Sequence, residues 1–187
     1  KNEVIEVPEL IRSQVSQFLT VNQEKMVSDW TGRRVALLVP TFNKHNSTTY
    51  LTSTFLPSLK ATISKRELNN FMVTLYIGYD VNDPVLNIPL EDYIPQGNFA
   101  VKLHRLPSIR WATAMWNILY NDAMMDGNDY FLQVGDDVKF NEAGWLTAMT
   151  SELDGMGGVG VVGPRDTTWN CKIMTQSMVT RKHHDIF

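Results

Sequence analysis

The sequence contains a single cysteine, Cys171, among its 187 residues, and one thiol cannot build an internal disulfide framework. Its apolar runs all stay well short of the ~20 residues that a membrane-spanning helix requires. Its net charge of −3, with both signs interspersed, provides no basic face for binding phosphate backbones. These shortages exclude a disulfide-stapled scaffold and predict neither a membrane span nor a nucleic-acid partner.

The hydrophobic content of 43% is sufficient for one well-buried core in a chain of this length. Continuous apolar runs predict strands, and apolar residues at helical spacing predict helices. The helix at 49–63 should be kinked or restarted at Pro57, and Trp111 and Trp116 should pack into the core. We expect strands at 35–39, 71–78, 99–106, 130–134 and 159–162, and helices at 8–30, 49–63, 110–125 and 143–153.

The order of these elements predicts an α/β fold with a mostly parallel central sheet and helices on both faces. We expect a helical extension over residues 1–32 and a single domain over residues 33–187. The chain begins at Lys1 without a visible targeting segment, so a processed or shortened chain is expected.

Polar, conformationally permissive residues follow three of the expected strands, at 40–43, 78–80 and 135–137. Because ligands of open α/β sheets bind outside the carboxyl ends of the strands, these segments should open onto one crevice. Asp136 and Asp137 are adjacent at the third end, where ionised carboxylates must be solvated, paired or bound to a cation. Oxygen ligands of this kind favour Mg²⁺ or Mn²⁺ held together with substrate phosphates. The sequence therefore predicts a divalent cation that links the two aspartates to a diphosphate.

Four segments resemble the nucleotide-sugar-binding half of GT-A glycosyltransferases in their order and spacing: "VALLVPTFN", "VTLYIGYD", "YFLQVGDDVKFNEAGWL" and "GVGVVGP". The pattern is similar to family 2-like enzymes, and still more similar to glycosyltransferase domains of algae and large algal (chlorella) viruses. The resemblance covers residues 33–187 and implies a single GT-A-type, Rossmann-like domain that is truncated at the acceptor side. It also implies a cytoplasmic location, in the host cytoplasm if the protein is viral.

The resemblance assigns the metal and the nucleoside contacts. "GDDV" resembles the Asp-x-Asp metal motif, with Gly135 where the first aspartate usually stands. Asp137 is then the direct metal ligand, and Asp136 faces the metal, the ribose or the diphosphate. Asp80 matches an acid near the nucleoside. Thr41, flanked by Pro40 and Phe42, matches a contact to the base.

The resemblance also implies roles for four residues later in the chain. Arg110 would approach the diphosphate, because its planar guanidinium is always charged, and Asn117 would bond the donor sugar. Asp166 would be the general base that orients an acceptor hydroxyl. His183 would complete the metal site.

Simpler structural roles stay open for several of these positions. Asp136 and Asp137 could form a solvated turn that caps the next helix. Thr41 could cap a loop, Arg110 could form a surface ion pair, and Asn117 could lie on the polar face of its helix. The roles of Asp80, Asp166 and His183 have equally plain alternatives in turns and loops.

The predicted function is metal-dependent transfer of a sugar from a nucleoside diphosphate sugar to an acceptor hydroxyl, of a glycan or glycoprotein. UDP is the most frequent nucleotide in the family, and the resemblance implies the hexosyl- or deoxyhexosyltransferase class. Two alternatives stay open: a nucleotidyltransferase or sugar-nucleotide pyrophosphorylase, and a non-catalytic carbohydrate-binding module. The first usually has a glycine-rich loop after its first strand, and "PTFNKHNS" has no glycine. The second leaves the three polar strand ends unexplained.

Overall fold

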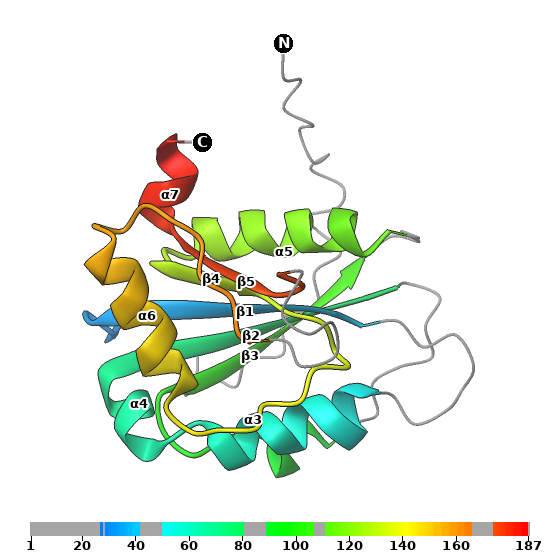
Figure 1. Ribbon diagram of the computed structural model, residues 1–187. Coiled ribbons are helices and arrows are strands. Elements are labelled where there is room, and N and C mark those ends of the chain that lie inside the picture. The colour runs from blue at the N-terminus through cyan, green and yellow to red at the C-terminus, as the bar shows by residue number, and fades with distance from the viewer. Residues whose placement is uncertain are drawn as a thin grey trace.

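A five-stranded sheet with the order β3-β2-β1-β4-β5 organises the chain (Figure 1). The computed structural model describes residues 27, 29–41, 50–80, 89–106, 111–165 and 174–186, with Asp80 described by its backbone only. Neighbouring strands are parallel except β5, which pairs antiparallel with β4. The strands are β1 Arg33–Thr41, β2 Phe71–Asp80, β3 Phe99–Leu106, β4 Tyr130–Gln133 and β5 Ser177–Thr180.

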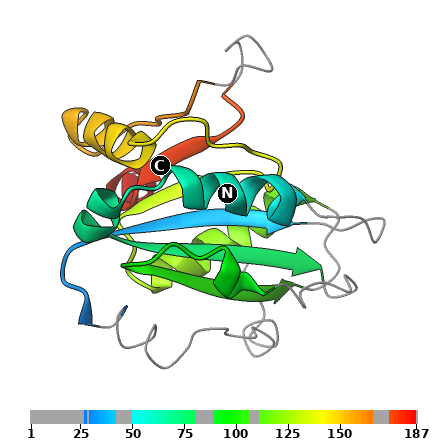
Figure 2. The same cartoon turned by 90° about the horizontal axis from the view of Figure 1, so that it is seen from below.

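Helices cover both faces of this sheet, as Figures 1 and 2 show. One face carries α5, and the other carries α3, α4 and α6. The helical elements are the π-helical turn η1 Leu51–Phe55, α3 Leu56–Thr62, α4 Lys65–Asn70, the 3₁₀ turn η2 Leu90–Asp92, α5 Ala112–Met125, α6 Trp145–Gly155 and α7 Arg181–Ile186. This arrangement confirms the predicted α/β class with a mostly parallel sheet. No helix in the described part of the chain is long and apolar enough to cross a bilayer.

The central strand β1 shows why its sequence is apolar without alternation. Val35, Leu37 and Val39 pack on the side of α3, α4 and α6, whereas Ala36 and Leu38 pack on the side of α5. All five side chains have 0% exposure. A strand covered on both faces needs apolar residues at successive positions, and this pattern is what predicted it.

The prediction of a strand at 159–162 is wrong. That stretch contributes only an isolated antiparallel bridge between Val162 and Met178. The fifth strand lies instead at Ser177–Thr180, where Thr180 pairs with Tyr130 and Ser177 with Gln133. Gly157 and Gly158 adopt positive φ angles of 70° and 78°, so the glycine-rich stretch forms a turn after α6.

The restart at Pro57 is confirmed, because η1 ends at Phe55 and α3 begins with Pro57 in its first turn. The short helix α4 was not predicted, although its sequence carries a capping box. Ser64 accepts from the Glu67 amide, and the Glu67 side chain accepts from the Ser64 amide. The spacing of Ser64 and Glu67 is the sequence signal that would have found it.

The two tryptophans of the central helix have different environments. Trp116 packs against the core, and its Nε1 donates to the Leu38 carbonyl at 3.1 Å, which confirms that prediction. Trp111 is 74% exposed, so its predicted core position is wrong. The reason is that Trp111 is the extended N-cap residue of α5, one position before helical geometry begins.

The N-terminal extension predicted over residues 1–32, with its helix at 8–30, lies largely outside the described residues. The last part of it is attached to β1. Arg34 Nη2 donates to the Val27 and Trp30 carbonyls at 2.9 and 2.8 Å, and Trp30 Nε1 donates to the Arg33 carbonyl at 3.1 Å.

A polar cluster fixes the end of α5 to β2 and β3. Asp126 Oδ2 accepts hydrogen bonds from Tyr76 and from Lys102, each at 2.6 Å. Asn128 donates to the Tyr76 hydroxyl at 2.9 Å. Burial, together with the nearby Asp126 carboxylate, raises the pKa of Tyr76 well above its usual value. These bonds give Asp126 and Lys102 structural roles.

Candidate active site

The strand order places a topological switch point between β1 and β4. From β1, the strands β2 and β3 lie on one side, and β4 and β5 lie on the other. The carboxyl ends of the parallel strands β1 and β4 therefore flank the position where ligands of open α/β sheets bind. Thr41 is the last residue of β1 and Asp136 follows β4, so the structure brings these two predicted residues together.

A hydrogen bond joins the two strand ends. Thr41 Oγ1 donates to Asp136 Oδ2 at 2.7 Å, and Thr41 is only 1% exposed. The Val138 amide donates to the Gly135 carbonyl at 3.3 Å, which closes a turn over residues 135–138. Asp136 is half-buried in this turn, whereas Asp137 is exposed. The turn thus fixes one carboxylate to the neighbouring strand and presents the other to solvent.

The hydroxyl of Thr41 is bonded to Asp136 and orients it. The predicted contact of Thr41 to the nucleotide base stays a prediction. Pro40, beside it, is buried in β1 and pairs with Gly78 of β2. The hydrogen bonds between β1 and β4 end at Leu38. The N–H group that Pro40 lacks would therefore have formed no hydrogen bond to β4.

Gly135 leaves the space that the Asp137 carboxylate occupies. A Cβ atom added at Gly135 would lie 2.6 Å from Asp137 Oδ1. The Gly135 amide also donates to Gln176 Oε1 at 3.0 Å, so a residue next to β5 supports the turn from its other side. An aspartate at this position, as in the Asp-x-Asp motif, would displace the Asp137 carboxylate.

The sequence predicts Mn²⁺-dependent binding of UDP at this turn, and we expect Gly135→Ala to weaken it about 10-fold, the size of effect typical of residues that orient metal ligands. The added methyl group would force the flexible Asp137 side chain out of its position. Gly135 is not among the glycines with positive φ, so the free energy of unfolding should change by less than ~1 kcal/mol. Calorimetric titration and urea denaturation measure the two effects. An unchanged Kd would show that Asp137 does not act from this position.

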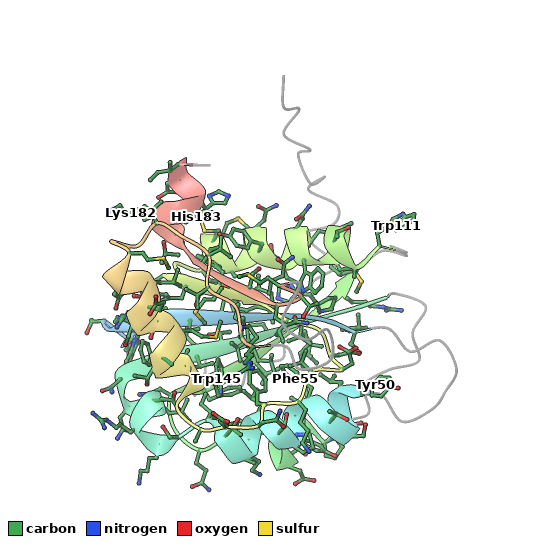
Figure 3. The ribbon with its side chains drawn as sticks, viewed as in Figure 1. Tyr50, Phe55, Trp111, Trp145, Lys182 and His183 are labelled. Atoms are coloured by element: carbon green, nitrogen blue, oxygen red, sulfur yellow. The ribbon has the colours of Figure 1, made fainter. Side chains whose placement is uncertain are left out.

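His183 does not lie near the two aspartates. Thr180 pairs with Tyr130 at the amino end of β4, and α7 follows directly, so His183 lies at the opposite end of that strand from Asp137. Figure 3 shows His183 on α7. The predicted contribution of His183 to a shared metal site therefore finds no support in the arrangement. The physical reason is that β5 runs antiparallel and carries the chain away from the carboxyl ends of the other strands.

The available ligands fit a magnesium or manganese ion that binds together with a substrate. Within the described ranges, no group of three or more His, Cys, Asp or Glu side chains could hold a metal ion. Asp136 and Asp137 provide two carboxylates at one turn. Mg²⁺ sites of this kind use one or two carboxylates, with phosphate oxygens and water as the remaining ligands.

The other predicted residues are placed only in part. Asn117 lies on α5 and is exposed, and its predicted bond to the donor sugar stays a prediction. Asp80 is the last residue of β2, and its backbone pairs with Leu106. Phe42, Arg110 and Asp166 lie outside the described residues, so their predicted contacts to donor and acceptor stay predictions.

A cleft of about 1000 Å³ lies beside the carboxylate turn, whose last residue, Val138, lines it. Asp136 and Asp137 are not among its lining residues. Its walls come from β4, the segment after the turn, α6, and residues on both sides of the connection to β5. The lining residues are Leu132, Val134, Val138, Lys139, Phe140, Asn141, Glu142, Trp145, Ala148, Met149, Val162, Gly163, Pro164, Arg165 and Gln176.

The segment between the turn and α6 is fixed at Phe140. Its amide donates to Ser58 Oγ of α3 at 3.1 Å. Its ring packs edge-on against Phe55, with 5.6 Å between the ring centroids. It also packs against Trp145 in a tilted arrangement, with 4.6 Å between the centroids. Figure 3 labels Phe55 and Trp145, the two residues against which the Phe140 ring packs. The two aspartates are thus held between a pinned β1 end and a pinned segment after the turn.

Two residues of this site were missed in the sequence. Gln176 was missed because the strand that positions it, β5, was not predicted. Ser58 was missed because a hydroxyl on a helix surface gives no sequence signal for a partner 82 positions later.

Comparisons with known proteins bear on the fold. No protein-family model matches the chain, and no curated protein matches its sequence. A crystal structure from Desulfovibrio desulfuricans G20, described as a "putative nucleotide-diphospho-sugar transferase", matches with a TM-score of 0.51 and 13% sequence identity. The match covers 82% of this chain and 65% of that chain. The chain therefore shares the α/β fold of this nucleotide-diphospho-sugar transferase structure, as the GT-A-like pattern of its sequence predicts.

Proposed function

We propose that the protein is a metal-dependent glycosyltransferase that uses a nucleoside diphosphate sugar, with UDP as the nucleotide, as its donor. The acceptor is a hydroxyl group of a glycan, and the sugar is a hexose or deoxyhexose. One observation carries this proposal: a pair of carboxylates, one of them bonded to Thr41 and the other exposed, lies at the switch point of the sheet. The similarity of the fold to a nucleotide-diphospho-sugar transferase structure supports it.

The residues of the turn hold the site in place. Thr41 and Gln176 fix the two sides of the turn, so the Asp137 carboxylate is presented without further ordering of the backbone on binding. Mn²⁺ or Mg²⁺ bound by Asp137 and Asp136 would neutralise charge on the departing diphosphate. A carboxylate near the acceptor, with Asp166 as the candidate, would accept the proton of the attacking hydroxyl.

The wider setting of the protein follows from the same proposal. The proposal includes a relationship to glycosyltransferase domains of algae and large algal viruses, and a cytoplasmic site of action. They rest on the four sequence segments and on no feature of the structure. A nucleotidyltransferase would release diphosphate rather than transfer a sugar, and a carbohydrate-binding module would bind no nucleotide.

A thermal-shift panel of nucleotide sugars, with and without Mn²⁺, tests the proposal. A ligand that binds only the folded state raises the melting temperature by mass action. We expect UDP-sugars to raise it in the presence of Mn²⁺ and to have little effect with EDTA. Release of UDP on incubation with the stabilising donor, assayed alongside, separates an enzyme from a binding module. No shift with any nucleotide sugar would contradict the proposal.

We expect Asp80→Ala to weaken the binding of UDP and of UDP-sugar by the same amount. The loss should be ~1–3 kcal/mol, the range for losing a hydrogen bond to a charged group. The reason is that Asp80 lies at the carboxyl end of β2, next to β1 in the sheet, where the resemblance places a nucleoside contact. Calorimetry with both ligands measures the two losses. A loss confined to the UDP-sugar would place Asp80 at the sugar end of the donor.

A further inference from the structure

The cleft beside the carboxylate turn has the dimensions and lining of a small-ligand site. Its volume of about 1000 Å³ is at the upper end of the usual range for such sites. Most of its lining residues are apolar, and the polar ones are Lys139, Asn141, Glu142, Arg165 and Gln176. We refer to it as the Trp145 cleft, after the largest side chain that lines it.

Aromatic rings form one wall of the Trp145 cleft. Trp145 and Phe140 pack with their ring planes 32° apart, and Phe55 supports Phe140 from the interior with 0% exposure. Trp145 and Phe140 are themselves only half-buried, so part of each ring borders the cleft. A rigid, partly exposed aromatic wall suits a ligand that has an apolar face of its own.

The indole nitrogen of Trp145 is closed to solvent. Trp145 Nε1 is shielded and forms no hydrogen bond to any of the residues that the structure describes. The residue as a whole is only half-buried, so a ligand in the cleft meets the exposed part of the ring and not its N–H.

The charges around the cleft are mixed. Lys139 and Arg165 carry positive charge and Glu142 carries negative charge, and all three are exposed at the cleft. Asn141 adds an amide that can both donate and accept hydrogen bonds. Such a rim favours a neutral ligand with several hydroxyl groups over a strongly anionic one.

We propose that the Trp145 cleft binds a neutral pyranose ring. The apolar face of the ring packs on Trp145 and Phe140, and its hydroxyl groups bond to the polar rim. Gln176 lines the cleft and also accepts the Gly135 amide, so the cleft and the carboxylate turn share a residue. Resting on the proposed function, this ring is a sugar of the acceptor glycan, bound next to the donor diphosphate.

The indole N–H resonances in ¹⁵N–¹H correlation spectra provide a direct test, because the chain has five tryptophans. The probes are the methyl pyranosides of glucose, galactose and mannose, added without nucleotide or metal. We expect at least one of them to shift the Trp145 resonance in a saturable manner. Trp145→Phe identifies that resonance by its loss, and it replaces the indole by a smaller aromatic wall.

Two variants report on the binding itself. Trp145→Phe and Asn141→Ala should each weaken the binding of the pyranoside about 10-fold. Saturation-transfer NMR on the sugar protons measures this loss. Trp111→Phe is the matched control, because Trp111 is 74% exposed at the start of α5 and should leave the affinity unchanged. A melting curve for each variant verifies that it is folded. If Trp145→Phe is not folded, Asn141→Ala still tests the proposal.

Three results would overturn the proposal. The first is that no pyranoside shifts the Trp145 resonance. The second is that a pyranoside binds the folded Trp145→Phe and Asn141→Ala variants as tightly as the parent. The third is that anilinonaphthalene sulfonate binds in a Trp145-dependent manner and no pyranoside displaces it, which would identify an apolar docking surface.

A titration with UDP and Mn²⁺ on the same sample separates this proposal from the donor site. Pyranoside binding at Trp145 without UDP binding would support the cleft and contradict the proposed function. UDP binding without pyranoside binding would support the donor site and overturn the cleft as a sugar site.

Discussion

Asp137→Ala should abolish Mn²⁺-dependent binding of UDP and leave the fold as stable as that of the parent. Asp137 is exposed at the turn after β4, and the proposed cation has few other protein ligands. The loss of a residue that only orients a metal ligand typically weakens metal binding 10–100-fold. The loss of a direct ligand should therefore weaken binding at least ~100-fold. That factor corresponds to about 2.7 kcal/mol of binding free energy.

The expected stability of the variant follows from the same geometry. Two adjacent carboxylates repel each other, and the removal of one relieves this repulsion in the metal-free protein. Asp137 is exposed, and no hydrogen bond to it is needed to close the turn, which the Val138 amide closes. The free energy of unfolding without metal should therefore be unchanged or slightly increased.

Calorimetric titration of UDP, with Mn²⁺ and with EDTA, measures the loss, and urea denaturation measures the stability. Glu152→Ala is a suitable control, since it removes an exposed carboxylate from α6 at a distance in sequence from the turn. Its Kd for UDP should equal that of the parent. If Asp137→Ala binds UDP with Mn²⁺ as tightly as the parent, the assignment of the metal ligand is wrong.

The sheet could be predicted from the sequence because its parallel strands are buried on both faces. Val35 to Val39 must be apolar at every position, and an unbroken apolar run is easily recognised. The strand β5 has no such run. Ser177 and Val179 are half-buried while Met178 and Thr180 are buried, because β5 lies at the edge of the sheet. Its short alternating sequence resembles a loop.

The carboxylate turn could be predicted as a position but not as an arrangement. Local sequence shows that Asp136 and Asp137 follow a buried strand, and the α/β order indicates which edge of the sheet they occupy. The partners are not local: Thr41 lies 95 residues away from Asp136, and Gln176 lies 41 residues away from Gly135. His183 was assigned by resemblance alone, without knowledge that an antiparallel strand would carry it to the other end of β4.

A second variant, Glu67→Ala, should lower the free energy of unfolding by about 3 kcal/mol, through the loss of acceptors at two helix ends. Glu67 is 1% exposed and belongs to α4. Its Oε2 accepts from the Ser64 amide at 2.9 Å and from the Ser64 hydroxyl at 2.8 Å. Its Oε1 accepts from the Thr147 amide at 3.0 Å. One carboxylate therefore serves the first turns of both α4 and α6.

The second of these ends explains why the effect should be large. The N-cap residue of α6 is Gly144, in a left-handed conformation, and it has no side chain with which to cap the helix. Glu67 supplies the missing acceptor from another helix, and its negative charge also interacts favourably with the positive end of α6. Alanine would leave the Thr147 amide without this partner in a part-buried environment.

Urea denaturation of Glu67→Ala, Glu67→Gln and Glu91→Ala distinguishes this role from a general effect of charge. Glutamine keeps one carbonyl acceptor and loses the other, so its destabilisation should lie about halfway. Glu91 is exposed, and its replacement should have little effect. Because α6 begins with Trp145, a displaced helix end should also weaken pyranoside binding in the Trp145 cleft. If Glu67→Ala is as stable as the parent, α6 must hold its first turn by its packed face alone, through Leu146, Met149 and Leu153.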